Sequence, residues 1–170
     1  MIVVDTTVWA DWFNGTQTPE VDRLDRALTA QDAGLTPLIL TEVLQGFRAD
    51  ADFERARALL ARLPVLELDV DGHVAAAALF RRLRRRGITV RGAVDCIVAQ
   101  TCIAANAALL TGDRDFTAIA RHAPLRLCAV KRESTASTTP IARWPIPSAG
   151  RGARESRRRG KAGRSPRGCR

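Results

Sequence analysis

The chain has 170 residues, of which 46% are apolar, enough for the core of one domain of ordinary size. It has no run of about eighteen apolar residues, so no membrane-spanning helix is expected, and its start lacks the basic segment and apolar stretch of a secretory signal. The four cysteines form no CxxC pair and there are only two histidines, which argues against a zinc site. We therefore expect a cytoplasmic protein with reduced thiols.

The net charge of +9 is unevenly distributed along the chain. Residues 1–130 contain 15 Lys and Arg against 16 Asp and Glu, whereas residues 131–170 contain 12 against 2. The second segment is also low in complexity and nearly without core residues, so it cannot bury enough apolar surface to order itself. We predict one domain over 1–130 and a basic, disordered tail over 131–170.

From the N-terminus onwards, the apolar pattern alternates between the periods of strands and helices. The first strand is Ile2 to Val4, and the helix after it is capped by Thr6 or Thr7 and carries three aromatic residues, which are more typical of a core than of an interface. The later predicted strands are Gly34 to Thr36, 65–68, 108–111 and 125–130. The later predicted helices cover 20–30, 37–47, 53–63, 72–86, 94–106 and 116–120.

This alternation predicts an α/β domain with a mainly parallel sheet. In such sheets the functional groups gather at the carboxyl ends of the strands. Asp5 ends the first strand, and Asp113 follows the strand over 108–111. We therefore expect these two carboxylates to lie at the same edge of the sheet.

Four carboxylates stand at the ends of predicted core segments, and their surroundings read VVDTT, LTEVLQG, VDCIVAQ and TGDRDF; they are Asp5, Glu42, Asp95 and Asp113. A carboxylate in apolar surroundings is costly unless a cation meets it. Hard cations such as Mg²⁺ prefer oxygen ligands and keep several waters, and such sites usually act on phosphate. The four carboxylates together therefore predict a divalent-metal site.

Each carboxylate also has a simpler interpretation. Asp5 can cap the helix that follows it, and Glu42 can be an exposed helix charge. Asp95 can lie in the first turn of its helix, where the dipole favours a negative charge, and Asp113 can belong to a Gly-Asp turn. Taken together, the four simpler interpretations are less convincing, because two of the four residues directly follow strands. In a fold of this class the functional sites lie at such strand ends.

The stretches IVVDTTVW, LTEVLQGF and VRGAVDCIVAQTCIAANAALLTGDRDFTAI resemble, in order and spacing, the PIN-domain ribonucleases that are VapC-type toxins of bacterial VapBC toxin–antitoxin systems. The resemblance covers about residues 1–130. It implies a PIN-like α/β/α sandwich, dependence on Mg²⁺ or Mn²⁺, and endoribonuclease activity on RNA, with tRNA or rRNA loops as substrates. It also implies a VapB-type antitoxin that blocks the acidic pocket, and a toxin homodimer.

By the same resemblance, Asp5, Glu42, Asp95 and Asp113 match the catalytic acidic positions, and Asp5 and Asp95 match the usual metal ligands. Thr6 or Thr111 is expected beside a metal-held water. The products of such hydrolysis should carry a 5′-phosphate and a 3′-hydroxyl. Asp115 competes with Asp113 for the fourth position, and we expect it to be a neighbouring charge or the cap of the 116–120 helix.

Arginines near the end of the helix over 72–86 have two interpretations, and Arg91 extends their patch; the cluster is Arg81, Arg82, Arg84, Arg85 and Arg86. Either they form a solvated helix end favoured by the dipole, or they bind RNA phosphates beside the site.

Two other functions remain open at this point. One is a non-catalytic nucleic-acid-binding protein acting through its Arg-rich tail, and the other is a flap-type DNA nuclease.

Overall fold

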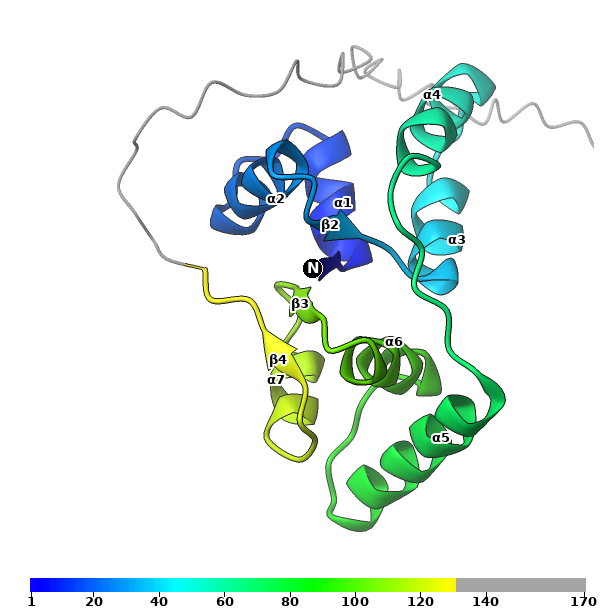
Figure 1. Ribbon diagram of the computed structural model, residues 1–170, viewed down its shortest axis with the longest axis vertical. Coiled ribbons are helices and arrows are strands. Elements are labelled where there is room, and N and C mark those ends of the chain that lie inside the picture. Colours follow the sequence, from blue (N-terminus) through cyan, green and yellow to red (C-terminus); the bar gives the residue numbers. More distant parts are fainter. Residues whose placement is uncertain (131–170) are drawn as a thin grey trace, which may run out of the picture.

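A four-stranded parallel sheet forms the centre of the computed structural model, which describes residues 1–130 (Figure 1). The predicted tail over 131–170 lies outside the described residues, so the domain boundary stays a prediction. In spatial order the strands are β2 (Ala33–Gly34), β1 (Ile2–Val4), β3 (Ala108–Leu110) and β4 (Arg126–Leu127). Val3 lies opposite Gly34 on one side and Leu109 on the other, so β1 is central and the predicted parallel sheet is confirmed.

Seven helices surround this sheet within the described residues. In Figure 1 the pair α1 and α2 and the pair α5 and α6 lie on opposite sides of the strands, as in an α/β/α sandwich. The helix α2 contacts β2, α6 contacts β3, and α7 contacts β4. The helices are α1 (Thr6–Phe13), α2 (Pro19–Thr29), α3 (Pro37–Gln45), α4 (Asp50–Leu60), α5 (Val70–Arg85), α6 (Ala93–Ala104) and α7 (Arg114–Ala120).

Local sequence signals determine where several helices begin. The hydroxyls of Thr18 and Thr36 accept hydrogen bonds from backbone N–H groups in the first turns of α2 and α3, and a proline follows each threonine. The prediction that Thr6 or Thr7 caps the first helix was wrong, because Asp5 is the capping residue. Its carboxylate leaves both threonine hydroxyls available for other contacts.

The aromatic residues of α1 belong to the core, as predicted. Trp9 is fully buried, and Trp12 and Phe13 are 9% and 7% exposed. The rings of Trp12 and Phe13 meet edge-on with centroids 5.0 Å apart, and Phe13 packs in the same way against Phe47 after α3. Such edge-to-face pairs are favourable beyond their buried area, so this cluster fixes α1 against α3.

The strand predicted over 65–68 was wrong in its extent. Only Val65 forms a parallel bridge, to Leu35, and two backbone hydrogen bonds of 2.9 and 2.8 Å support that bridge. Pairing stops there because Thr36 already caps α3, and Val65 itself is 40% exposed. The strand predicted over 125–130 is confirmed as the edge strand β4, in a shorter form.

Cys96, Cys102 and Cys128 are free thiols, and the first two are buried. Burial raises the pKa of Cys96 to about 11 and that of Cys102 to about 12, so both are neutral packing residues at physiological pH. None of the helices in residues 1–130 combines the length and apolar character needed to cross a membrane.

Candidate active site

The candidate site lies where the order of the sheet changes direction. From β1 the chain continues to β2 on one side and later returns to β3 on the other side. The carboxyl ends of β1 and β3 therefore flank a switch point, where α/β proteins generally place their ligands. The backbone N–H of Asp5 donates to Leu110 O at 2.9 Å and holds the two strand ends together.

Asp5 is 7% exposed and is held by three hydrogen bonds. Its Oδ1 accepts from the Thr6 backbone N–H at 2.8 Å, which makes it the N-cap of α1. Its Oδ2 accepts from the hydroxyls of Thr7 at 2.7 Å and Thr111 at 2.8 Å. Burial raises the pKa of Asp5, the three hydrogen bonds oppose this rise, and the charge of Asp113 adds to it. The fold therefore fixes this carboxylate, and no cationic side chain of residues 1–130 pairs with it.

Thr111 connects the two strand-end carboxylates. While its hydroxyl donates to Asp5, its oxygen accepts from the Asp113 backbone N–H at 3.0 Å. Asp113 caps α7 through its Oδ1, which accepts from the Asp115 backbone N–H at 2.9 Å. A continuous series of hydrogen bonds thus runs from the end of β1 to the first turn of α7.

Asp95 lies in the first turn of α6 and is partly buried. Its pKa is raised to about 6, first by loss of solvation and then by the charges of Asp115, Asp113 and Asp5. The interaction with three other carboxylates indicates that Asp95 lies near them, although the four residues come from three different segments. We refer to Asp5, Asp95, Asp113 and Asp115 as the acidic cluster.

Glu42 reaches the same region from α3. Its Oε2 accepts a hydrogen bond of 2.6 Å from the hydroxyl of Thr6, the residue next to Asp5. Glu42 is half-buried, so the interpretation of a freely exposed helix charge does not describe it. The structure therefore brings all four sequence-predicted carboxylates to one edge of the sheet, with Glu42 joined through Thr6.

One of the two roles predicted for Asp115 was the cap of the 116–120 helix, and this was wrong. The helix α7 begins at Arg114, and Asp113 is its capping residue. The Oδ2 of Asp115 instead accepts from the Arg91 backbone N–H at 3.2 Å. Asp115 also raises the pKa of Asp95, so its role is that of a neighbouring charge.

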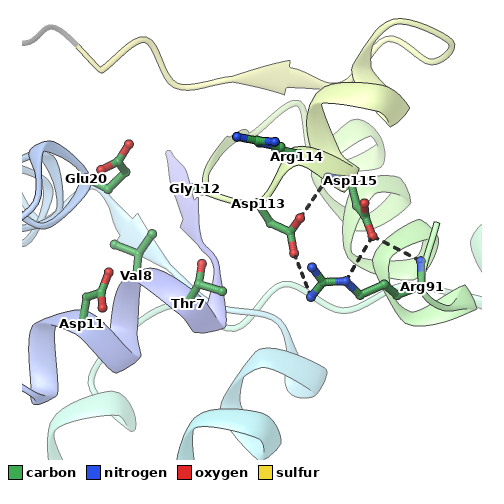
Figure 2. Close-up of a pocket in the computed structure, with 9 residues that line it drawn as sticks. All are labelled: Thr7, Val8, Asp11, Glu20, Arg91, Gly112, Asp113, Arg114 and Asp115. Atoms are coloured by element: carbon green, nitrogen blue, oxygen red, sulfur yellow. Dashed lines mark hydrogen bonds and ion pairs between the residues drawn. The ribbon is translucent and has the colours of Figure 1, made fainter. Parts of the chain in front are cut away.

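A cavity of about 620 Å³ opens beside the acidic cluster (Figure 2). Asp113, Asp115 and Arg91 line one wall, and Arg114 lies at its rim. The opposite wall is formed by α1 and the start of α2, and it contributes Thr7, Val8, Asp11 and Glu20. The cavity therefore has carboxylates on both walls and arginines on the side of α6 and α7.

Two of the arginines near the end of α5 make structural contacts that neither of the two predicted roles described. Arg82 donates to the His122 carbonyl at 3.3 Å, and Arg86 contacts His122 Nδ1 at 3.1 Å, so both tie α5 to the turn after α7. Arg84 lies over the Phe80 ring at 5.8 Å, and Arg81 and Arg85 are exposed. None of the five lines the cavity, whereas Arg91 does.

Several cavity residues were missed by the sequence reasoning, namely Asp11, Glu20, Arg114 and the role of Thr7 as a hydrogen-bond donor to Asp5. A signal was present for Asp11, because it follows Thr7 by four residues and therefore shares its helix face. Glu20 and Arg114 carried no comparable signal, since their positions depend on how α2 and α7 pack.

The donor set fits a hard divalent cation. Its members are carboxylate oxygens, their charges repel one another, and neither Asp5 nor Asp95 forms an ion pair within residues 1–130. In the same part of the chain no three Asp, Glu, His or Cys side chains converge into a ready-made metal cage. This arrangement suits Mg²⁺, which binds through one or two carboxylates and keeps several waters.

Comparison with known proteins agrees with this geometry. The PIN domain family model matches residues 2–122. The chain is 34% identical over 136 residues to VapC ribonuclease Mb1587 of Mycobacterium bovis and to ribonuclease VapC11 of Mycobacterium tuberculosis. These alignments cover 77% of this chain and 100% of each relative.

Solved structures share the fold at lower sequence identity. The VapBC2 complex of Rickettsia felis, bound to a DNA fragment from its promoter, matches with a TM-score of 0.60 at 19% identity. VapBC-1 of nontypeable Haemophilus influenzae matches with a TM-score of 0.59 at 18% identity. Both matches cover 75% of this chain and 97% of the other chain.

Proposed function

The chain belongs to the PIN-domain family, as a ribonuclease of the VapC type, and we propose that the acidic cluster between β1 and β3 is the site at which it hydrolyses RNA. It is the toxin endoribonuclease of a toxin–antitoxin pair and has a cognate antitoxin.

One observation carries the assignment of the site. Burial raises the pKa of Asp95 to about 6, and carboxylates from two other segments lie close enough that their charges add to this rise. Carboxylates that repel one another destabilise a fold, and a bound cation would remove this repulsion.

Asp5 and Asp95 would hold the metal ion, because both are buried or partly buried carboxylates without a partner cation in residues 1–130. When bound, Mg²⁺ or Mn²⁺ would activate water and neutralise charge on the phosphate. The hydroxyls of Thr7 and Thr111 fix the orientation of the Asp5 carboxylate.

Asp113 and Glu42 flank this pair and supply the remaining carboxylates. Asp113 lines the open cavity, so it can orient the attacking water and accept its proton. Glu42 is held by the hydroxyl of Thr6, the residue next to Asp5, and can take the same role from α3. Attack by water needs no 2′-hydroxyl, so the products carry a 5′-phosphate and a 3′-hydroxyl.

The test of this mechanism uses the purified protein with a mixture of bacterial tRNA and ribosomal RNA in the presence of Mg²⁺. Asp5→Asn is the informative variant, because asparagine also caps a helix through its side-chain oxygen, whereas the charge and the second acceptor oxygen of Asp5 are lost. Asp69→Asn, which changes the N-cap of α5 in the same way, is the matched control. We expect Asp69→Asn to cleave normally and Asp5→Asn to lose cleavage. Equal cleavage by both variants, or cyclic-phosphate ends, would refute the mechanism.

We further propose that the substrates are exposed loops of tRNA or rRNA in the cytoplasm, that a VapB-type antitoxin inhibits the enzyme, and that the toxin forms a homodimer. The arginines of the cavity suit a phosphate backbone, whereas the carboxylates beside them would repel phosphate unless a metal ion offsets their charge. Mapping the 5′ ends of cellular RNA after a short pulse of expression identifies the bonds that are cut.

Two further measurements separate this function from the alternatives. Cleavage of structured DNA in preference to RNA would favour a flap-type nuclease. Deletion of residues 131–170, which lie outside the described part of the chain, should leave cleavage intact in an enzyme but remove all activity from a protein that binds nucleic acid through its tail.

A further inference from the structure

Arg91 is the one cationic side chain that touches the acidic cluster within residues 1–130 (Figure 2). Its Nη1 lies 3.7 Å from Asp113 Oδ2, and its Nε lies 3.8 Å from Asp115 Oδ2. The guanidinium thus stands between two carboxylates and faces the cavity.

The segment that carries Arg91 is anchored without help from the guanidinium. The backbone N–H of Arg91 donates to Asp115 at 3.2 Å, and the preceding residue, Val90, is 5% exposed. Any side chain at position 91 keeps both contacts. A substitution there therefore removes the charge while the segment stays docked on α7.

The ion pairs of Arg91 are weak by their geometry. Both distances exceed those of charge-assisted hydrogen bonds, and the Arg91 side chain is 83% exposed. Exposed pairs of this kind contribute little to stability because water screens them and the side chain loses rotamer freedom. Asp113 and Asp115, by contrast, are only about one-fifth exposed, so their charges are poorly solvated and gain from any nearby cation.

We propose that Arg91 is a substrate-binding residue with two alternative partners. In the protein without metal its guanidinium partly neutralises Asp113 and Asp115, and with the charge of a divalent cation at Asp5 and Asp95 beside them it would be released to bind an RNA phosphate at the cavity. Two features support the contact of Arg91 with RNA phosphate, namely the exposure of the side chain and its place on the cavity wall. The planar guanidinium also matches two phosphate oxygens at once. This inference rests on the proposed ribonuclease function.

The decisive variant is Arg91→Gln, and Arg114→Gln is its matched control. Arg114 lines the same cavity, is exposed, and forms no ion pair within residues 1–130, so both variants remove one positive charge from the same wall. The two readouts are Mn²⁺ affinity by calorimetry without RNA, and KM and kcat for cleavage of a fluorescent single-stranded oligoribonucleotide with Mg²⁺.

We expect Arg91→Gln to bind Mn²⁺ about threefold more tightly than the wild type, because the competing cation is gone, and to raise KM about tenfold with kcat within about twofold. The change in Mn²⁺ affinity caused by Arg114→Gln should be less than half of the change caused by Arg91→Gln. The thermal midpoint of Arg91→Gln should match that of the wild type.

Three outcomes overturn the inference. Mn²⁺ affinity can be unchanged or weaker in Arg91→Gln, both variants can tighten it equally, or KM can stay at the wild-type value. Failure of the proposed function looks different, because the wild type itself then neither binds Mn²⁺ nor cleaves the oligoribonucleotide, and the role of Arg91 falls with it.

Discussion

Replacement of Asp95 by asparagine should stabilise the metal-free protein while it abolishes cleavage. The pKa of Asp95 is raised from its ordinary value of 3.8 to about 6 by burial and by the charges of Asp115, Asp113 and Asp5. Each pKa unit corresponds to about 1.4 kcal/mol, so the charged form costs up to about 3 kcal/mol. Asp95 is partly exposed, and solvent screening reduces this cost to about 1–2 kcal/mol.

The sign of the pH dependence follows from proton binding. Between pH 3.8 and about 6 the folded protein holds more protons at Asp95 than the unfolded chain, so its free energy of unfolding falls as the pH rises. The full cost is present above pH 6. Asp95→Asn carries no such charge, so its advantage should be absent near pH 4 and complete at pH 7.5.

Thermal unfolding in EDTA measures this difference directly. For a chain of this size we expect Asp95→Asn to melt about 3–6 °C above the wild type at pH 7.5, with no such gain near pH 4. Asp71→Asn, in the exposed first turn of α5, is the matched control and should leave the midpoint unchanged. Added Mg²⁺ should raise the wild-type midpoint only, since a bound ion stabilises the state that binds it. A midpoint of Asp95→Asn below that of the wild type at pH 7.5 would refute the reasoning.

Three further predictions concern neighbouring residues. Thr111→Val removes the hydrogen bond to Asp5 and should lower kcat about tenfold and stability by about 1–2 kcal/mol, with Thr111→Ser retaining both when cleavage and denaturant unfolding are measured. Asp11→Asn combined with Glu20→Gln removes two negative charges from the cavity wall, so RNA should bind more tightly at low salt and end mapping should reveal altered nucleotide preference beside the cut. Arg82→Gln loses its contact to the turn after α7, and should lower the melting midpoint by a few degrees while KM for RNA stays constant.

The strand ends of the site could be predicted because their signal is local. A β-branched run that stops at Asp5, and the apolar stretch that ends before Asp113, identify both residues without knowledge of the fold. Parallel pairing then places them at one edge of the sheet. The helix N-caps at Thr18 and Thr36 are local for the same reason.

The contacts that hold the site could not be predicted, because they join distant segments. Thr111 and Asp5 are separated by 106 positions, and nothing near either residue indicates that their side chains meet. The structural contact of Arg82 could not be predicted for the same reason, since it depends on the turn after α7 bringing His122 beside α5. The predicted strand over 65–68 failed because strand propensity does not reveal where the neighbouring strand stops.

The simple and the functional interpretations of the carboxylates turn out to be compatible, and this compatibility explains how the fold tolerates the acidic cluster. Asp5 and Asp113 are N-caps, and Asp95 lies in the first turn of α6. Each charge therefore sits at the positive end of a helix dipole, which stabilises it by about 0.3–1 kcal/mol. Backbone N–H groups also donate to Asp5 and Asp113. These contributions offset part of the mutual repulsion before any cation binds. The acidic cluster thus lies where helices start, because those positions let the metal-free protein carry the charge that a bound cation would compensate.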